Sequence, residues 1–181
     1  MDTYIINSSP REKGSCAFIA NKIEEDILKD KSVKTLNLNK MNYRGCQACY
    51  SCKLNNSFCV VDDGLSPYLA DFSKADLFII LTPNYYGFCS GQLKLFLDRW
   101  FCLIDKHRRS KLKEGGKLFF IVTQGAPDRS NSGVLLKWIE RFAKHYFLKF
   151  YGIVVPNCSK DNLDSPRLKF DEIKMALNMF I

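Results

Sequence analysis

Several features that would point to a secreted or membrane protein are missing from this 181-residue sequence. Its first residues, MDTYIINSSP, hold no basic stretch followed by an apolar one, so we expect no signal peptide. No apolar run approaches the roughly 20 residues that a membrane-spanning helix needs. Internal repeats, low-complexity tracts and Pro/Ser-rich linkers are also absent. We therefore expect one soluble, cytoplasmic domain over residues 1–181 that does not act at a membrane.

Two phosphate-binding motifs and the common nucleic-acid motifs are absent as well. The sequence contains neither GxGxxG nor GxxxxGK[ST], which disfavours a dinucleotide or a nucleoside triphosphate. The net charge of +8 would suit an anionic partner. However, the densest basic run, KHRRSKLKEGGK at 106–117, is most simply interpreted as a solvated helix end and loop. No RNA-recognition, zinc-finger or helix-turn-helix pattern accompanies it, so we predict no nucleic-acid partner.

What the sequence does contain is a regular alternation of short apolar runs and amphipathic stretches. Strands are predicted over 3–8, 33–38, 76–82, 117–123 and 149–155, and helices over 15–29, 64–73, 91–105, 132–146 and 166–180. Runs such as FIIL and LFFIV are apolar on both faces, which is typical of a parallel sheet covered by helices on each side. The fold class is therefore α/β, a doubly wound three-layer sandwich. Its ligands are expected at the carboxyl ends of the strands.

Three loops that follow predicted strands have the composition of a cofactor site. NSSPREKGSC (7–16) combines hydroxyls, a cation and a permissive glycine just before a helix, which suits a phosphate group. TPNYYGFCSGQLK (82–94) offers exposed backbone and aromatic surface, which suits a flat heteroaromatic ring. TQGAPD (123–128) adds a third loop with little side-chain bulk. Simpler interpretations remain open, namely that Ser15 is an ordinary helix N-cap and that the two tyrosines only anchor their loop.

A cleft with a phosphate end and a ring end fits flavin mononucleotide (FMN) better than other common cofactors. We predict that it is bound by residues of all three loops: Ser9, Arg11, Ser15, Cys16, Pro83, Asn84, Tyr85, Tyr86, Gly87, Thr123, Gln124 and Gly125.

In their order and spacing, SSPREKGSC, TPNYYGFCSGQLKLFLDRW and TQGAP resemble the flavodoxin-like NAD(P)H-dependent FMN reductase superfamily. The resemblance extends from residue 3 to about 155. It implies a flavodoxin-like fold with strand order 2-1-3-4-5, FMN as cofactor and an NAD(P)H-dependent oxidoreductase activity. The first loop in that family usually reads like GSPRxxGNT and wraps the FMN phosphate. Here Ser8 replaces the first glycine, and Cys16 stands where threonine is usual.

Residues 45–59, GCQACYSCKLNNSFC, place four cysteines within one short segment. Cys46, Cys49, Cys52 and Cys59 have the spacing C-x2-C-x2-C-x6-C, and three thiolates from one tight loop plus a fourth nearby suit a 4Fe–4S cluster. The segment, an insertion at about 45–63, is similar to that of the iron–sulfur flavoproteins of the same superfamily. Zinc and unligated thiols stay open as alternatives, whereas a disulfide is disfavoured in a reducing cytoplasm. The other four cysteines are interpreted as packing residues, although Cys16 and Cys89 lie in the predicted flavin loops.

The leading functional hypothesis is an FMN-dependent oxidoreductase that passes electrons from NAD(P)H, or from a cluster, to an unknown acceptor. No general acid, base or nucleophile is assigned. The alternatives are an FMN-binding electron carrier without small-molecule turnover and a zinc-binding module that uses the basic run. The resemblance also implies a homodimer or homotetramer.

Overall fold

The computed structural model describes residues 1–181 and contains a single five-stranded parallel sheet. Its strands are β1 (Asp2–Asn7), β2 (Ser32–Asn37), β3 (Leu77–Pro83), β4 (Lys117–Thr123) and β5 (Lys149–Val155). They are arranged in the order β2-β1-β3-β4-β5, and all four pairs are parallel. The predicted fold class and strand order are therefore confirmed. The strand order reverses between β1 and β3, so the connections that follow these two strands lead to opposite faces of the sheet and leave a crevice at their carboxyl ends.

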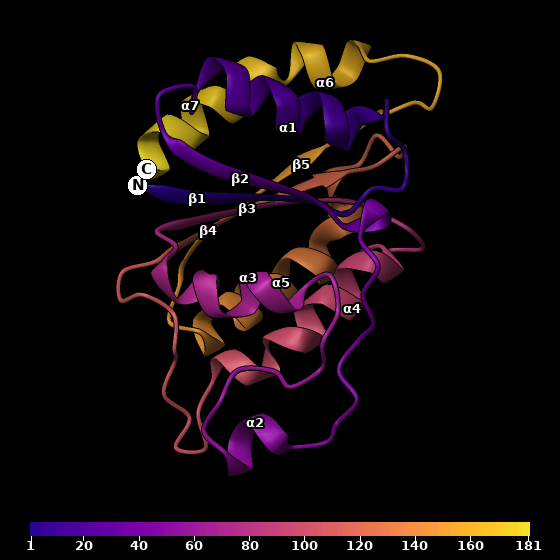
Figure 1. Cartoon of the computed structure of the whole chain (residues 1–181). Coiled ribbons are helices and arrows are strands. Elements are labelled where there is room, and N and C mark those ends of the chain that lie inside the picture. The colour runs from indigo at the N-terminus through magenta and orange to yellow at the C-terminus, as the bar shows by residue number, and fades with distance from the viewer.

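Helices cover both faces of the sheet, which makes three layers (Figure 1). One face carries α1 (Ser15–Asp26), α6 (Asp164–Leu168) and α7 (Phe170–Phe180). The other carries α3 (Ser66–Asp71), α4 (Gly91–Arg99) and α5 (Gly133–His145). Short 3₁₀ turns occupy Leu38–Lys40, Phe72–Lys74, Trp100–Leu103 and Arg129–Ser132. Several helices are shorter than predicted: the helix predicted over 15–29 ends at Asp26, and those predicted over 64–73 and 91–105 become 3₁₀ turns after Asp71 and Arg99. The helix predicted over 166–180 is divided at Lys169.

Because side chains alternate along each strand, the sheet divides the core into two clusters. Ile6, Phe78 and Phe120 point to the α3–α5 side, where they pack in a cluster that includes the fully buried Trp100. Ile5, Ile79 and their neighbours point to the opposite side and pack against α1 and α7. Strands buried on both faces explain the continuous apolar runs of the sequence.

The cysteine segment forms an excursion outside the α3–α5 layer rather than part of the sheet. It contains the one-turn helix α2 (Ser51–Leu54), which lies at the far side of that layer from the sheet (Figure 1). Cys52 points inward and belongs to the core cluster of this side. No helix of the structure has the length and apolarity needed to cross a membrane.

Candidate functional site

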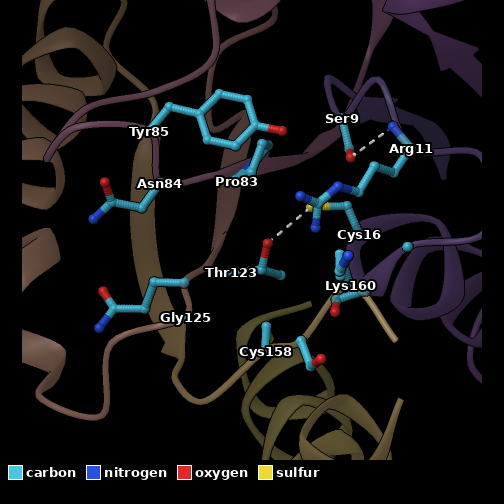
Figure 2. Close-up of a pocket in the computed structure, with 14 residues that line it drawn as sticks. Ser9, Arg11, Cys16, Pro83, Asn84, Tyr85, Thr123, Gly125, Cys158 and Lys160 are labelled. Atoms are coloured by element: carbon cyan, nitrogen blue, oxygen red, sulfur yellow. Dashed lines mark hydrogen bonds between the residues drawn. The ribbon is translucent and has the colours of Figure 1, made fainter. Parts of the chain in front are cut away.

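A cavity of about 270 Å³ opens at the carboxyl edge of the sheet, where the loops after β1, β3, β4 and β5 converge (Figure 2). Ten of the twelve residues predicted to bind the cofactor line it. The full lining is Ser9, Arg11, Gly14, Ser15, Cys16, Pro83, Asn84, Tyr85, Thr123, Gln124, Gly125, Cys158, Ser159 and Lys160.

At one end of this cavity the N-terminus of α1 is open. Gly14 occupies the N-cap position, and no side chain accepts a hydrogen bond from the first helical N–H groups. The simpler interpretation of Ser15 as the N-cap is therefore wrong, since Ser15 is the first helical residue. A β-carbon at Gly14 would lie 2.9 Å from the β-carbon of Arg11, so the loop closes tightly only around glycine. Free N–H groups, the positive end of the helix dipole and the Arg11 side chain together would suit a bound anion.

A buried serine pair holds this loop against the sheet. Ser8 is fully buried, and its hydroxyl donates to the Leu81 carbonyl at 2.9 Å. The hydroxyl of Ser90 donates to the Ser8 hydroxyl and lies 3.0 Å from it. Ser90 also caps α4, accepting from the Leu93 N–H. Ser8, which replaces the glycine expected from the resemblance, therefore joins the β1 loop to the start of α4.

Cys16 lies in the first turn of α1 with its sulfur 3.2 Å from the Thr123 hydroxyl. Burial raises the pKa of its thiol to about 12, so the side chain is neutral at physiological pH. A neutral thiol does not repel an anion bound at the same helix end. Cys16 therefore stays compatible with a phosphate site although it is not the usual threonine.

The opposite wall of the cavity is built on backbone that is fixed by hydrogen bonds. The Asn84 N–H donates to the Thr123 carbonyl at 2.7 Å, and the Asn84 side-chain amide donates to the Ser132 hydroxyl at 2.8 Å. Ser132 donates in turn to the Gln124 side-chain oxygen at 2.5 Å. These contacts link the β3 and β4 loops to the start of α5, so Tyr85 projects from a rigid loop.

Tyr86 and Gly87 do not line the cavity. Tyr85 and Phe88 pair as an isolated antiparallel bridge, and Tyr86 and Gly87 form the turn between them with positive φ angles of 53° and 80°. This turn directs the Tyr86 side chain fully into solvent. Their contact with the cofactor stays a prediction, since neither residue borders the cavity.

The sequence reasoning missed the loop after β5, which supplies Cys158, Ser159 and Lys160 to the cavity. Cys158 was interpreted as a packing residue; it is half-buried and also borders the site. The rule that ligands lie at the carboxyl ends of strands could have found it, since PNCSK directly follows the fifth strand.

Cys46, Cys49, Cys52 and Cys59 together line a second, smaller cavity that shares no residue with the first. Cys46 and Cys49 are exposed, Cys59 is half-buried and Cys52 is buried. Ala48 and Tyr50 adopt left-handed backbone conformations, with φ of 52° and 57°, which turn the segment sharply between its cysteines. No three Cys, His, Asp or Glu side chains lie close enough in this arrangement to hold a single metal ion.

The thiols of this segment differ in acidity. Hydrogen bonds from the Ser51 side chain and backbone lower the pKa of Cys49, while burial raises the pKa of Cys52. Cys46, Cys49, Cys52 and Cys59 line one cavity together with the buried Cys102, and the Ala48 N–H donates to the Cys46 sulfur at 3.4 Å. Four thiols from one segment fit the donor set of a cluster. The chain's residues are therefore compatible with one.

Arg99, at the end of α4, ties together the two ends of the cysteine segment. Its side chain has no exposed surface, and Nη1 donates to Asp63 at 2.6 Å and to the Arg44 carbonyl at 2.8 Å. Nη2 donates to the Val61 carbonyl at 3.2 Å. Burial opposes ionisation of Asp63, but the Arg99 hydrogen bond and two backbone N–H groups outweigh it and lower the pKa of that carboxyl. One carboxylate oxygen of Asp63 is thus the partner of this buried cation, while the other accepts from the Leu65 N–H at 3.0 Å just before α3.

The first cavity fits FMN on two features of this chain. A glycine whose β-carbon would clash leaves the helix N-terminus open for a phosphate, and the loops after β3 and β4 offer fixed backbone beside the Tyr85 ring. Ser9, Arg11, Ser15 and Cys16 would hold the phosphate, while Pro83, Asn84, Tyr85 and the β4 loop would border the ring.

Comparison with known protein families gives one match. Residues 1–159 fit the family model described as NADPH-dependent FMN reductase. Among curated proteins, the chain is 30% identical over 115 residues to an iron-sulfur flavoprotein of Methanosarcina thermophila, covering 62% of this chain and 59% of that protein. It is 26% identical over 106 residues to an iron-sulfur flavoprotein of Clostridioides difficile, covering 56% of this chain and 47% of that one. The chain thus spans about half the length of these curated relatives.

Solved structures show the same fold at low sequence identity. An NAD(P)H:quinone oxidoreductase from Methanothermobacter marburgensis superposes with a TM-score of 0.77 at 14% identity, covering 97% of this chain and 94% of that one. An FMN-dependent NADH-azoreductase from Bacillus anthracis, solved in complex with FMN, gives a TM-score of 0.71 at 15% identity and covers 99% of both chains.

Proposed function

The chain belongs to the NADPH-dependent FMN reductase family, and from this we propose that it binds FMN at the carboxyl edge of its sheet and acts as an NAD(P)H-dependent oxidoreductase. When bound, FMN accepts a hydride or single electrons and releases them to an acceptor. The protein's own part is to bind the phosphate at α1 and to orient the ring between the β3 and β4 loops. No side chain is assigned as an acid, base or nucleophile.

The observation that carries this proposal is the open N-terminus of α1 inside the cavity. Gly14 and Arg11 approach closely there, and no side chain of the protein satisfies the first N–H groups. An anion at this place would satisfy them and complement the helix dipole. The family model and one neighbour of the same fold support this, since that neighbour was solved in complex with FMN.

Anaerobic mixing of the FMN-loaded protein with NADPH or NADH tests the donor. We expect one of the two nucleotides to remove the absorbance of oxidised flavin within seconds, and the reduced protein to be reoxidised by a quinone or an azo dye. Very slow reduction by both nucleotides would favour the alternative, an FMN-binding electron carrier without small-molecule turnover. The separate cavity lined by the four clustered cysteines and Cys102 is the observation that favours this alternative, because a cluster exchanges one electron at a time.

We also propose that Cys46, Cys49, Cys52 and Cys59 hold a 4Fe–4S cluster, which the names of the relatives support. Iron, sulfide, zinc and flavin, measured per chain on protein prepared without oxygen, test this. Close to four irons and four sulfides are expected. One zinc per chain would favour the structural-metal alternative, and absence of both would leave the segment as free thiols.

Two further proposals come from the family resemblance and the composition. A homodimer is expected, and light scattering should give twice the chain mass of 20.9 kDa. A cytoplasmic location stays a prediction from the sequence alone.

A further inference from the structure

Arg99 is a buried cation with one donor left over. The two terminal nitrogens are occupied by Asp63 and by the Arg44 and Val61 carbonyls. The third nitrogen, Nε, is buried and has no hydrogen-bond partner in the protein. A buried N–H without a partner costs stability, so such a group calls for an explanation.

The place of this unused donor supplies the explanation. Arg99 lines the cavity that Cys46, Cys49, Cys52 and Cys59 share. Apart from Gln47, Arg99 is the only residue of this lining with a polar nitrogen in its side chain, and the remainder are apolar, aromatic or thiol side chains. A cation with a free N–H therefore borders a site whose other groups are sulfur donors.

We propose that Arg99 donates from Nε to a sulfur of the cluster that these four cysteines hold, and so makes the cluster easier to reduce. The inference rests on the proposed cluster. An N–H donor and a positive charge beside the sulfurs stabilise the more negative, reduced state, and hydrogen bonds to sulfur are one of the means by which proteins set the potential of such clusters.

A purely structural role would not need Nε. The contacts that tie the two ends of the segment use Nη1 and Nη2, which leaves the edge of the guanidinium with Nε for another partner. A lysine ammonium would keep the positive charge. It lacks the planar guanidinium, which can hold the segment through Nη1 and Nη2 and donate from Nε at the same time. Substitution by lysine therefore separates the hydrogen bond from the charge.

The test is the reduction potential of the cluster in four variants of the full-length protein, together with iron per chain. In Arg99→Lys the equilibrium constant for reduction should fall about tenfold, which is 59 mV for one electron, and in Arg99→Gln it should fall further. Lys34→Gln is the control, since it removes a half-exposed charge that pairs with Asp71 outside the cysteine segment and should leave the potential nearly unchanged. Asp63→Asn weakens the contact of Arg99 with residue 63 but leaves the Arg99 Nε donor in place. The reduction potential of the cluster should therefore be unchanged or higher.

A second measurement on the wild-type protein does not depend on whether the variants fold. Pulsed electron paramagnetic resonance of the reduced cluster, in protein labelled with [15N]arginine, should reveal a nitrogen coupled to the cluster. Arg44→Lys in the same labelled background should keep that coupling, because the Arg44 contact to Arg99 is made by its carbonyl group.

The outcomes are distinct. A lowered potential in Arg99→Lys, or the arginine coupling, supports the inference. A normal iron content with an unchanged potential in Arg99→Lys and no arginine coupling overturns it while the cluster proposal stands. Wild-type protein that takes up no iron after anaerobic reconstitution overturns both.

Discussion

Gly14 is the residue on which the shape of the phosphate end depends most directly. Its backbone is extended, with φ of −87°, so its value here is the missing side chain rather than an unusual conformation. Any β-carbon would meet the Arg11 side chain at 2.9 Å and push the loop away from the helix end. The first turn of α1 and the loop before it therefore act as one unit.

Gly14→Ala should weaken FMN binding about tenfold, or about 1.4 kcal/mol, because the loop must shift to admit the methyl group. Fluorescence titration of FMN measures this. Gly133→Ala is the matched control, since no atom lies within 4 Å of a β-carbon there, and its affinity should equal that of the wild type. Equal affinity in both variants would argue against a tight fit at Gly14.

Cys16→Ser should strengthen FMN binding about threefold, because a hydroxyl is a better hydrogen-bond donor to a phosphate than a thiol is. The site is almost fully buried, and serine is close in size to cysteine. The same titration measures the change, with melting temperature as a check on folding. Weaker binding by a normally folded variant would show that this side chain does not face the phosphate.

At the scale of elements, the cysteine segment is attached to the α4 side of the fold by one buried ion pair. Asp63 accepts from Arg99 at 2.6 Å and from the Arg44 N–H at 3.2 Å, so it contacts both the helix and the start of the segment. Breaking a buried pair by removing one partner leaves a buried charge without compensation.

Asp63→Asn should lower the free energy of unfolding by about 3 kcal/mol at pH 7. The pKa of Asp63 lies below its ordinary value of 3.8 in the folded state, so its contribution is complete above that value and is lost as the pH falls through the folded pKa. Urea unfolding measures the free energy of unfolding of both proteins at pH 7 and near pH 3. The difference between wild type and Asp63→Asn should be smaller at the lower pH.

Asp71→Asn provides the comparison, because the pair of Asp71 with Lys34 is half-exposed and should contribute less than about 1 kcal/mol. If Asp63→Asn lowered the free energy of unfolding by no more than Asp71→Asn does, the Asp63–Arg99 pair would not be what attaches the segment to α4.

Elements of the fold were more predictable from the sequence than contacts between them. The strands over 77–83 and 117–123 lie within a residue of where their apolar runs predict, because a strand buried on both faces is apolar at nearly every position. The tie between Asp63 and Arg99 joins residues 36 apart, and no local pattern marks it. The hairpin at Tyr86 was equally hidden, since its direction depends on two positive φ angles at the loop tip.

At the scale of the whole molecule, the two proposed redox sites lie apart. The FMN cavity is at the carboxyl edge of the sheet, whereas the cysteine segment and α2 lie outside the α3–α5 layer (Figure 1). The sequence could place each site relative to its own strand or loop. The separation between them follows from how the excursion packs on α4, which the sequence did not reveal.

The central claim, that the first cavity binds FMN through its phosphate, is tested most directly by calorimetric titration with FMN and with riboflavin, which lacks the phosphate. The open end of α1 beside Arg11 predicts one FMN per chain and an affinity for riboflavin that is at least about 100-fold lower. No binding of FMN, or equal affinity for the two flavins, would contradict the account.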